Sequence, residues 1–123
     1  MQKSVSPCPV ESALAVIGGR WKILILCRLL RGVGRFNELR RAIEGISQRM
    51  LAQQLRELER DGIVERRAHA SSPPRVEYSV TEFGRTLEPV LDLLWDWGEA
   101  FQEQRAARVP PSSPPRVTPA AVK

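Results

Sequence analysis

The hydrophobic positions in the first third of the chain recur every three or four residues, which is the period of an amphipathic helix. Residues 9–17 carry Val10, Leu14 and Ile17 at this spacing and predict a short first helix. The next segment, RWKILILCRLLRG at 20–32, is apolar around more than half of its circumference. That breadth is typical of a central helix that neighbouring elements cover on most sides.

A second pair of helices follows, separated by a short turn. Residues 36–43, FNELRRAI, predict a third helix, and EGI at 44–46 predicts the turn. Ser47 is a suitable N-cap for a fourth helix ending at Asp61-Gly62, where glycine accommodates a left-handed backbone. The predicted core of this region is aliphatic and consists of Leu39, Ile43, Ile46, Leu51, Leu55, Leu58, Ile63 and Val64.

The pattern then changes to that of β-strands. Residues 63–69, IVERRAH, and 75–81, RVEYSVT, flank the polar loop ASSPP, whose prolines cannot extend a ladder, and they predict a hairpin. Thr81 then opens a long last helix through about residue 108, which Pro89 is predicted to kink. The predicted fold is mainly α with a small β-hairpin, in the order of a winged helix-turn-helix.

The length of 123 residues and the hydrophobic fraction of 42% fit one domain, which we place at residues 8–104. Residues 105–123 are basic and rich in proline, and we expect them to form a disordered tail. No apolar run approaches the ~18–20 residues of a membrane span, and the N-terminus lacks the hydrophobic region of a signal peptide. We therefore expect a cytoplasmic protein with no membrane partner.

The charge distribution favours a polyanionic partner. The net charge is +5 and the pI is near 10.0. Residues 82–103 nevertheless hold one basic side chain against six acidic ones, whereas residues 1–81 hold 14 basic and 8 acidic ones. The positive charge therefore avoids the last predicted helix.

The fourth predicted helix carries arginine and glutamine opposite its leucines. Arginine matches the O6 and N7 atoms of guanine, glutamine matches N6 and N7 of adenine, and a small alanine can approach a thymine methyl group. An ordinary exposed face, with arginines paired to Glu57, Glu59 and Asp61, is the alternative, but the hairpin and preceding turn favour DNA. The base-contact candidates are Gln48, Arg49, Ala52, Gln53 and Arg56.

Basic and polar side chains around this helix are candidates for phosphate contacts, which supply affinity and register. These candidates are Arg35, Arg40, Ser47, Arg60, Arg66, Arg67 and Arg75.

Four segments together resemble the HxlR-type family of bacterial winged-helix transcriptional regulators. They are CPVESALAVIGGRWKILIL, RFNELRRAIEGISQRMLAQQLRELERDGIVERR, PPRVEYSVTEFGRTLEPVL and DWG, within residues 8–98. The resemblance implies a homodimer on a pseudo-palindromic operator of double-stranded DNA, with helix 47–61 in the major groove and hairpin 63–81 as the wing. We expect such a regulator to act as a repressor.

The resemblance also implies that the first and last helices form the dimer interface. The apolar stripe of the last helix supports this, because a monomer has difficulty covering it. The interface candidates are Val10, Leu14, Leu87, Leu91, Leu94, Trp95, Trp97 and Phe101.

The two cysteines have different surroundings. Some HxlR-type proteins sense oxidants or electrophiles through a cysteine placed where Cys8 stands, and an N-cap position before Pro9 favours the thiolate form. The alternative is that Cys8 is an inert capping residue. Cys27 is interpreted as core.

No motif indicates catalysis or metal binding. His69 is the only histidine, and the chain has no Cys-x-x-Cys pair, so we expect neither a metal nor a cofactor, and no enzyme activity. A winged-helix module that binds protein, without specific DNA binding, is the alternative function.

Overall fold

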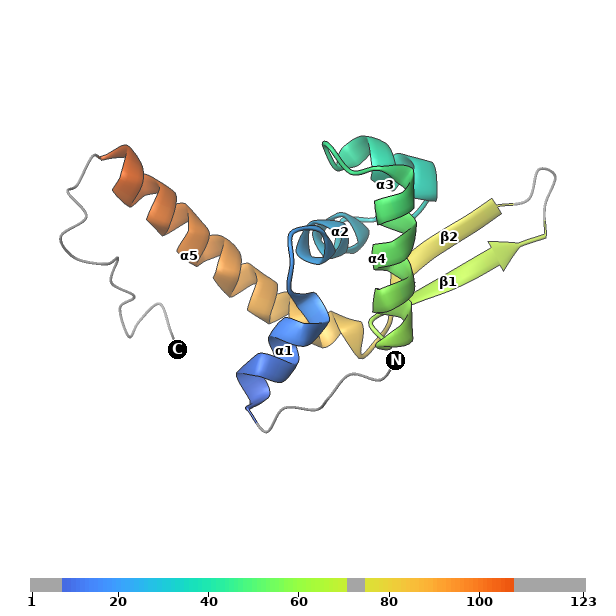
Figure 1. The fold of residues 1–123 in the computed structure, drawn as a ribbon, viewed down its shortest axis with the longest axis horizontal. Helices are drawn as coiled ribbons and strands as arrows, with labels where there is room; N and C mark the ends of the chain where they lie inside the picture. The colour runs from blue at the N-terminus through green and yellow to red at the C-terminus, as the bar shows by residue number, and fades with distance from the viewer. Residues whose placement is uncertain (1–7, 71–74, 108–123) are drawn as a thin grey trace. The chain divides into compact units, whose positions relative to one another are not determined.

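The computed structural model describes residues 8–70 and 75–107 (Figure 1). Its contacts divide the chain into two compact units, residues 1–85 and residues 86–123. The predicted mainly α fold with one hairpin is confirmed. The elements are α1 (Pro9–Ile17), α2 (Trp21–Leu30), α3 (Phe36–Ala42), α4 (Gln48–Arg60), β1 (Val64–His69), β2 (Arg75–Val80), the 3-10 turn η1 (Gly84–Leu87) and α5 (Glu88–Ala106).

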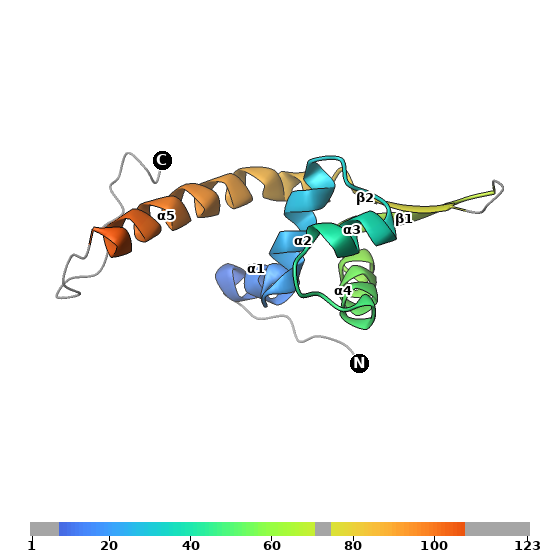
Figure 2. The same ribbon diagram turned by 90° about the horizontal axis from the view of Figure 1, so that it is seen from above.

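The core of the first unit forms where α2 contacts α3, α4 and β2, and where α4 contacts β1. All eight predicted core side chains, from Leu39 to Val64, are buried there, and so are Ile25, Leu26 and Leu29 of α2. Figure 2 shows α3 and α4 beside α2, with the hairpin extending from them as a flat ribbon. The leucine seam of α4 therefore faces inward, as predicted.

The start of α4 is fixed by its cap. Ser47 is in extended conformation, and its Oγ accepts a hydrogen bond of 3.0 Å from the backbone N–H of Met50. One of the N–H groups that a helix start leaves unpaired is thereby satisfied. At the other end Gly62 has a φ of +80°, and the Ile63 N–H donates to the Leu58 carbonyl at 2.9 Å as the chain turns into β1.

The hairpin is antiparallel, with Val64 opposite Val80 and Arg66 opposite Tyr78. A contact that the sequence analysis missed extends this sheet on its other edge. The Tyr78 N–H donates to the Gly34 carbonyl at 2.8 Å, and Arg35 forms an isolated antiparallel bridge with Glu77. The residues just before α3 are therefore attached to the wing.

The prediction for the start of the last helix was wrong. Thr81 does cap a turn, because its Oγ1 accepts from the Gly84 N–H at 2.9 Å, but this turn is η1, and α5 begins only at Glu88. The same hydroxyl donates to the Gly62 carbonyl at 2.6 Å, which ties this point of the chain to the end of α4.

Pro89 does not kink the helix. It lies in the first turn of α5, where a missing backbone N–H has no consequence. The helix continues to Ala106, beyond the expected domain end at residue 104, and most of the expected tail, residues 108–123, lies outside the described residues. No helix in the described part of the chain is long and apolar enough to cross a membrane.

α2 is covered on most sides, as predicted, since Leu24 is the one exposed residue of Trp21–Leu30, but the interpretation of Cys27 as core was wrong. Leu24 is 42% exposed and Cys27 is only half-buried, so Cys27 is not a core residue. Because α3, α4 and β2 contact the side of α2 that carries Ile25 and Leu29, Leu24 on the opposite side stays accessible. The buried side instead includes a charged residue, Lys22.

Candidate nucleic-acid interface

The outer side of α4 carries the predicted base-contact residues. Gln48, Arg49, Gln53 and Arg56 are exposed, and Ala52 is half-buried between them and the leucine seam. Within residues 8–70 and 75–107, the guanidinium groups of Arg49 and Arg56 form no ion pair. Both groups are therefore available to a ligand outside the chain.

Among the described residues, neither Glu57 nor Glu59 of α4 forms an ion pair with Arg49 or Arg56. Glu57 turns inward and places Oε1 2.6 Å from Nζ of Lys22, while its Oε2 accepts from Gln53 Nε2 at 3.4 Å. The hydrogen bond from Lys22 is the main reason that the pKa of Glu57 lies below its usual 4.5. Arg60 does follow the alternative interpretation, with Nε 3.8 Å from Oδ1 of Asp61.

The two arginines on β1 differ in their surroundings. Nε of Arg67 donates to Glu65 Oε2 at 2.9 Å, and a terminal nitrogen of Arg67 lies 2.8 Å from the same oxygen. The Arg67 side chain is 70% exposed. A pair that exposed contributes little to stability and can open for another anion. Arg66 is exposed and has no acidic partner among the described residues.

A cluster around Glu77 joins the wing to the start of α3. The Glu77 carboxylate lies 3.9 Å from Nε of Arg35, 3.8 Å from Nε of Arg75 and 3.2 Å from Nε2 of His69. Both arginines are among the phosphate candidates chosen from the sequence. Their proximity could not be predicted, because the bridge between residues 35 and 77 joins distant segments.

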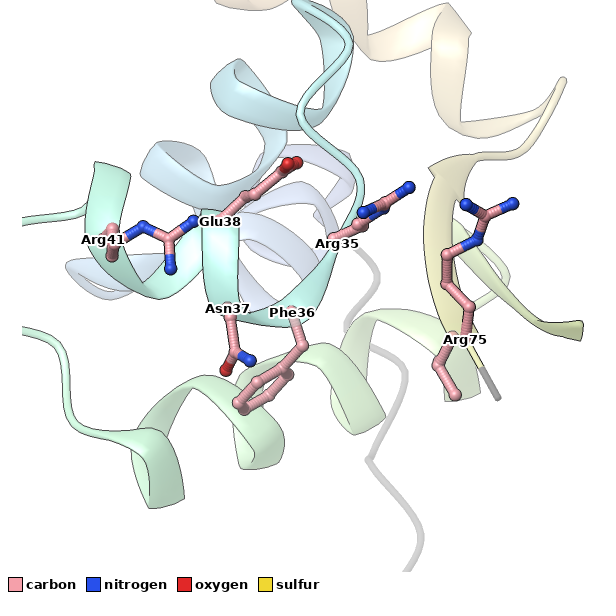
Figure 3. A pocket seen from close by; sticks show the side chains of 7 residues that line it. Arg35, Phe36, Asn37, Glu38, Arg41 and Arg75 are labelled. Carbon is pink, nitrogen blue, oxygen red and sulfur yellow. The ribbon is translucent and has the colours of Figure 1, made fainter. Parts of the chain in front are cut away.

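A hollow opens beside this cluster (Figure 3). Arg35 stands at the start of α3, Arg41 near its end, and Arg75 on β2, so guanidinium groups reach the hollow from two elements. The residues that line it are Arg35, Phe36, Asn37, Glu38, Arg41, Arg75 and Val76. Three arginines line the hollow together with Glu38, and Glu77 lies within 4 Å of Arg35 and Arg75. The excess of positive charge would attract an anion such as a backbone phosphate.

Two further phosphate candidates lie near α4. Arg40 is exposed on α3 and has no acidic partner in the part of the chain that the structure describes. Ser47 is exposed and already accepts the capping hydrogen bond, so its hydroxyl proton remains for an external acceptor.

The remaining candidate residues lie on α1 and α5, which belong to different units. Cys8 is the exposed N-cap residue of α1, and its side chain makes no capping hydrogen bond. On α1, Val10 is 65% exposed and Leu14 is 58% exposed. On α5 and the turn before it, Leu94, Trp95 and Trp97 are exposed, Leu87 and Phe101 are half-buried, and Leu91 is buried.

Among the described residues, no group of three or more His, Cys, Asp or Glu side chains could hold a metal ion. The side of α4 opposite the leucines exposes Arg49, Gln53 and Arg56, and the hairpin exposes Arg66, Arg67 and Arg75. Arginine and glutamine donate hydrogen bonds to base edges and phosphates.

Comparison with known proteins identifies the family. Residues 16–106 match the HxlR-like helix-turn-helix family. The chain is 55% identical over 97 residues to the HTH-type transcriptional regulator YdeP of Bacillus subtilis (strain 168), covering 79% of this chain and 76% of YdeP.

Two solved structures are similar to the chain as well. The redox regulator HypR in its oxidized form is 56% identical, with a TM-score of 0.71 over 75% of this chain and 95% of HypR. Diamide-treated YodB from B. subtilis is 42% identical, with a TM-score of 0.66 over 76% of this chain and 94% of YodB. The chain belongs to the HxlR-like helix-turn-helix family of winged-helix transcriptional regulators.

Proposed function

We propose that the protein is a transcriptional regulator that binds a specific sequence of double-stranded DNA by inserting α4 into the major groove. The observation that carries this proposal is the outer side of α4, where Arg49 and Arg56 are exposed without an ion pair while the leucines opposite are buried. The major groove admits an α-helix, and arginine and glutamine are the side chains that best distinguish guanine and adenine there.

The hairpin and the start of α3 supply contacts to the DNA backbone in this proposal. Arg66, Arg67 and Arg75 belong to the wing, Arg40 lies on α3, and Arg35 is the residue just before α3. Ser47 and Arg60, at the two ends of α4, complete the set. Such contacts fix the register of a protein on the duplex without reading its sequence.

We propose a homodimer that binds two half-sites. α1 exposes Val10 and Leu14, and α5 exposes Leu94, Trp95 and Trp97. Clusters of exposed apolar side chains of this kind mark interaction surfaces, and a two-fold dimer fits a pseudo-palindromic operator. Sedimentation should give a dimer, and Leu14→Glu or Trp95→Glu should shift it to a monomer, while Glu103→Gln should leave it unchanged.

The proposed action is repression. A protein that occupies an operator overlapping a promoter blocks transcription without needing a further surface to contact another protein.

We also propose that Cys8 makes DNA binding responsive to oxidants or electrophiles. The support is its exposed position ahead of α1 and the similarity to HypR and YodB, the first a redox regulator and the second crystallised after diamide treatment. Diamide should change the operator affinity of the wild type and of Cys27→Ser but not of Cys8→Ser.

The central experiment selects duplexes from a random library and measures their affinity at fixed salt. Arg49→Ala should weaken the selected duplex and relax the choice of base at one position by ~1–3 kcal/mol. Arg66→Ala should weaken all duplexes alike and lower the salt slope by about 1. Arg85→Ala, an exposed arginine outside the proposed interface, is the control for loss of charge.

A protein that selects no sequence, and binds no duplex more tightly than ~10⁻⁵ M at physiological salt, would be a protein-binding module instead. Equal affinities of the wild type and both arginine variants would contradict the placement of α4 in the groove.

A further inference from the structure

A buried lysine lies behind the proposed DNA-reading helix. Lys22 on α2 is 6% exposed, and its Nζ lies 2.6 Å from Oε1 of Glu57 on α4. A buried ammonium group is tolerated when it is paired, and this carboxylate supplies the pair. The ion pair therefore joins α2 to the inner side of α4.

The second oxygen of the same carboxylate has a different partner. Oε2 of Glu57 accepts a hydrogen bond from Nε2 of Gln53, one helical turn earlier, at 3.4 Å. Gln53 is exposed on the side of α4 that carries Arg49 and Arg56. A continuous series of contacts thus connects buried Lys22, through Glu57, to Gln53 on the proposed base-reading side of α4.

The contacts from Lys22 through Glu57 fix the orientation of the Gln53 side-chain amide. An ionised carboxylate has acceptors and no donors, so Gln53 must turn its NH₂ group toward Glu57. The pairing with Lys22 lowers the pKa of Glu57, which keeps the carboxylate ionised at neutral pH. Gln53 is left with its amide oxygen and one N–H directed away from the protein.

We propose that Lys22 and Glu57 are positioning residues that set the base preference of Gln53, making it select adenine. An outward amide oxygen accepts from an exocyclic amine, which only adenine and cytosine present in the major groove. The remaining N–H finds the N7 acceptor next to the amine on adenine, whereas cytosine offers no such acceptor. This inference rests on the proposed function, since it requires α4 in the major groove.

A purely structural ion pair would behave differently. If Lys22 and Glu57 only held α2 against α4, their replacement would change stability and weaken all duplexes alike. The preference for one base at the position that Gln53 contacts would not change. Base preference therefore separates a positioning role from a structural one.

The decisive variant is Glu57→Gln, which keeps the size of the side chain. Its carbonyl oxygen would accept from Lys22, because an ammonium group only donates, and its NH₂ group would then face Gln53. Gln53 would have to present its oxygen inward and both N–H groups outward. Outward donors fit the acceptors of guanine and thymine, so the preference should move away from adenine.

The experiment first identifies the base pair that Gln53 reads, as the position where Gln53→Ala loses its preference in duplexes selected by the wild type. Affinities for the four base pairs at this position are then measured for wild type, Glu57→Gln and Lys22→Met. We expect Glu57→Gln to reduce the preference for adenine over guanine by about tenfold, within the range that one such contact supplies. Lys22→Met, which leaves Glu57 without its anchor, should weaken the preference without reversing it.

Two controls isolate the effect. Glu59→Gln makes the same change of charge on an exposed residue of α4 and should leave every preference unchanged. In a Gln53→Ala background, Glu57→Gln should have no effect on base choice. Circular dichroism shows which variants are folded, and Lys22→Met provides the test if Glu57→Gln is not.

The inference is overturned if the folded variants keep the wild-type preference at this position, or if the change appears equally at all positions. A wild type that selects no sequence would instead refute the proposed function itself, so the two failures are distinguishable.

Discussion

Arg35 and Glu77 face each other across an antiparallel bridge, and their side chains form an ion pair of 3.9 Å between Nε and Oε2. The same carboxylate lies near Arg75 and His69 of the hairpin. A single glutamate therefore joins the start of α3 to the wing, in a cluster that is otherwise basic. It also reduces the positive potential that we propose meets the phosphates.

The first prediction concerns this glutamate. Glu77→Gln should raise the affinity for duplex DNA about two- to fivefold, because an exposed charge pair of this kind is worth less than about 1 kcal/mol. The salt slope should become steeper, since two arginines gain freedom to contact phosphates. Titration at several salt concentrations measures both. Glu103→Gln on α5 removes the same charge and should change neither, and an equal rise in both variants would refute the local explanation.

The second prediction concerns Gly34, whose carbonyl accepts from the Tyr78 N–H. A Cβ at this position would lie 2.8 Å from the backbone oxygen of Tyr78, which cannot move without disturbing β2. Gly34→Ala should therefore lower the free energy of unfolding by about 1–3 kcal/mol in urea titrations.

The matched control is Gly98→Ala in α5, where an added Cβ meets nothing within 4 Å. It should raise stability by roughly 0.5–1 kcal/mol, because alanine is the better helix former. Equal effects of the two substitutions would contradict the close approach of residue 34 to β2.

The third prediction tests the cap of α4. Ser47→Ala removes the acceptor for the Met50 N–H and should cost about 1 kcal/mol of unfolding free energy. Ser47→Asn keeps a capping oxygen and should stay within a few tenths of the wild type. Thermal or urea denaturation measures both, and an asparagine variant as unstable as the alanine variant would argue against the capping role.

The fourth prediction follows from the lowered pKa of Glu57. A carboxyl group whose pKa is depressed in the folded state stabilises the fold above its unfolded value, and this contribution disappears as the pH falls through the folded value. The wild type should thus lose stability as the pH drops below the usual 4.5 of a glutamate. Lys22→Met removes the main cause of the lowered pKa. The free energy of unfolding of this variant, measured by urea titration, should therefore depend less on pH in the acidic range. Parallel pH profiles would contradict this assignment.

Much of the fold could be predicted because the hydrophobic period is local. The aliphatic residues of α3 and α4 and the Ser47 cap followed from spacing alone, and each was confirmed by burial or a hydrogen bond. The predicted start of the last helix was wrong because the Thr81 hydroxyl bonds to the carbonyl of Gly62, a residue far away in sequence. That contact leaves a 3-10 turn before α5, and Pro89 then falls in the first helical turn, where proline is favourable.

The candidate site also has a part that could be predicted from the sequence and a part that could not. The residue types on the outer side of α4, Arg49 and Gln53 among them, could be chosen from the sequence, because a helix of known phase fixes which side chains share a side. The sequence by itself determined the order of elements, the leucine seam and the family resemblance.

Only the tertiary structure decided which charges meet. It paired Glu57 with buried Lys22 instead of with the neighbouring arginines, and it brought Arg35 to Glu77 across the sheet. Ion pairs between distant segments depend on how helices and strands pack, whereas periodicity records only the side of its own element on which a residue lies.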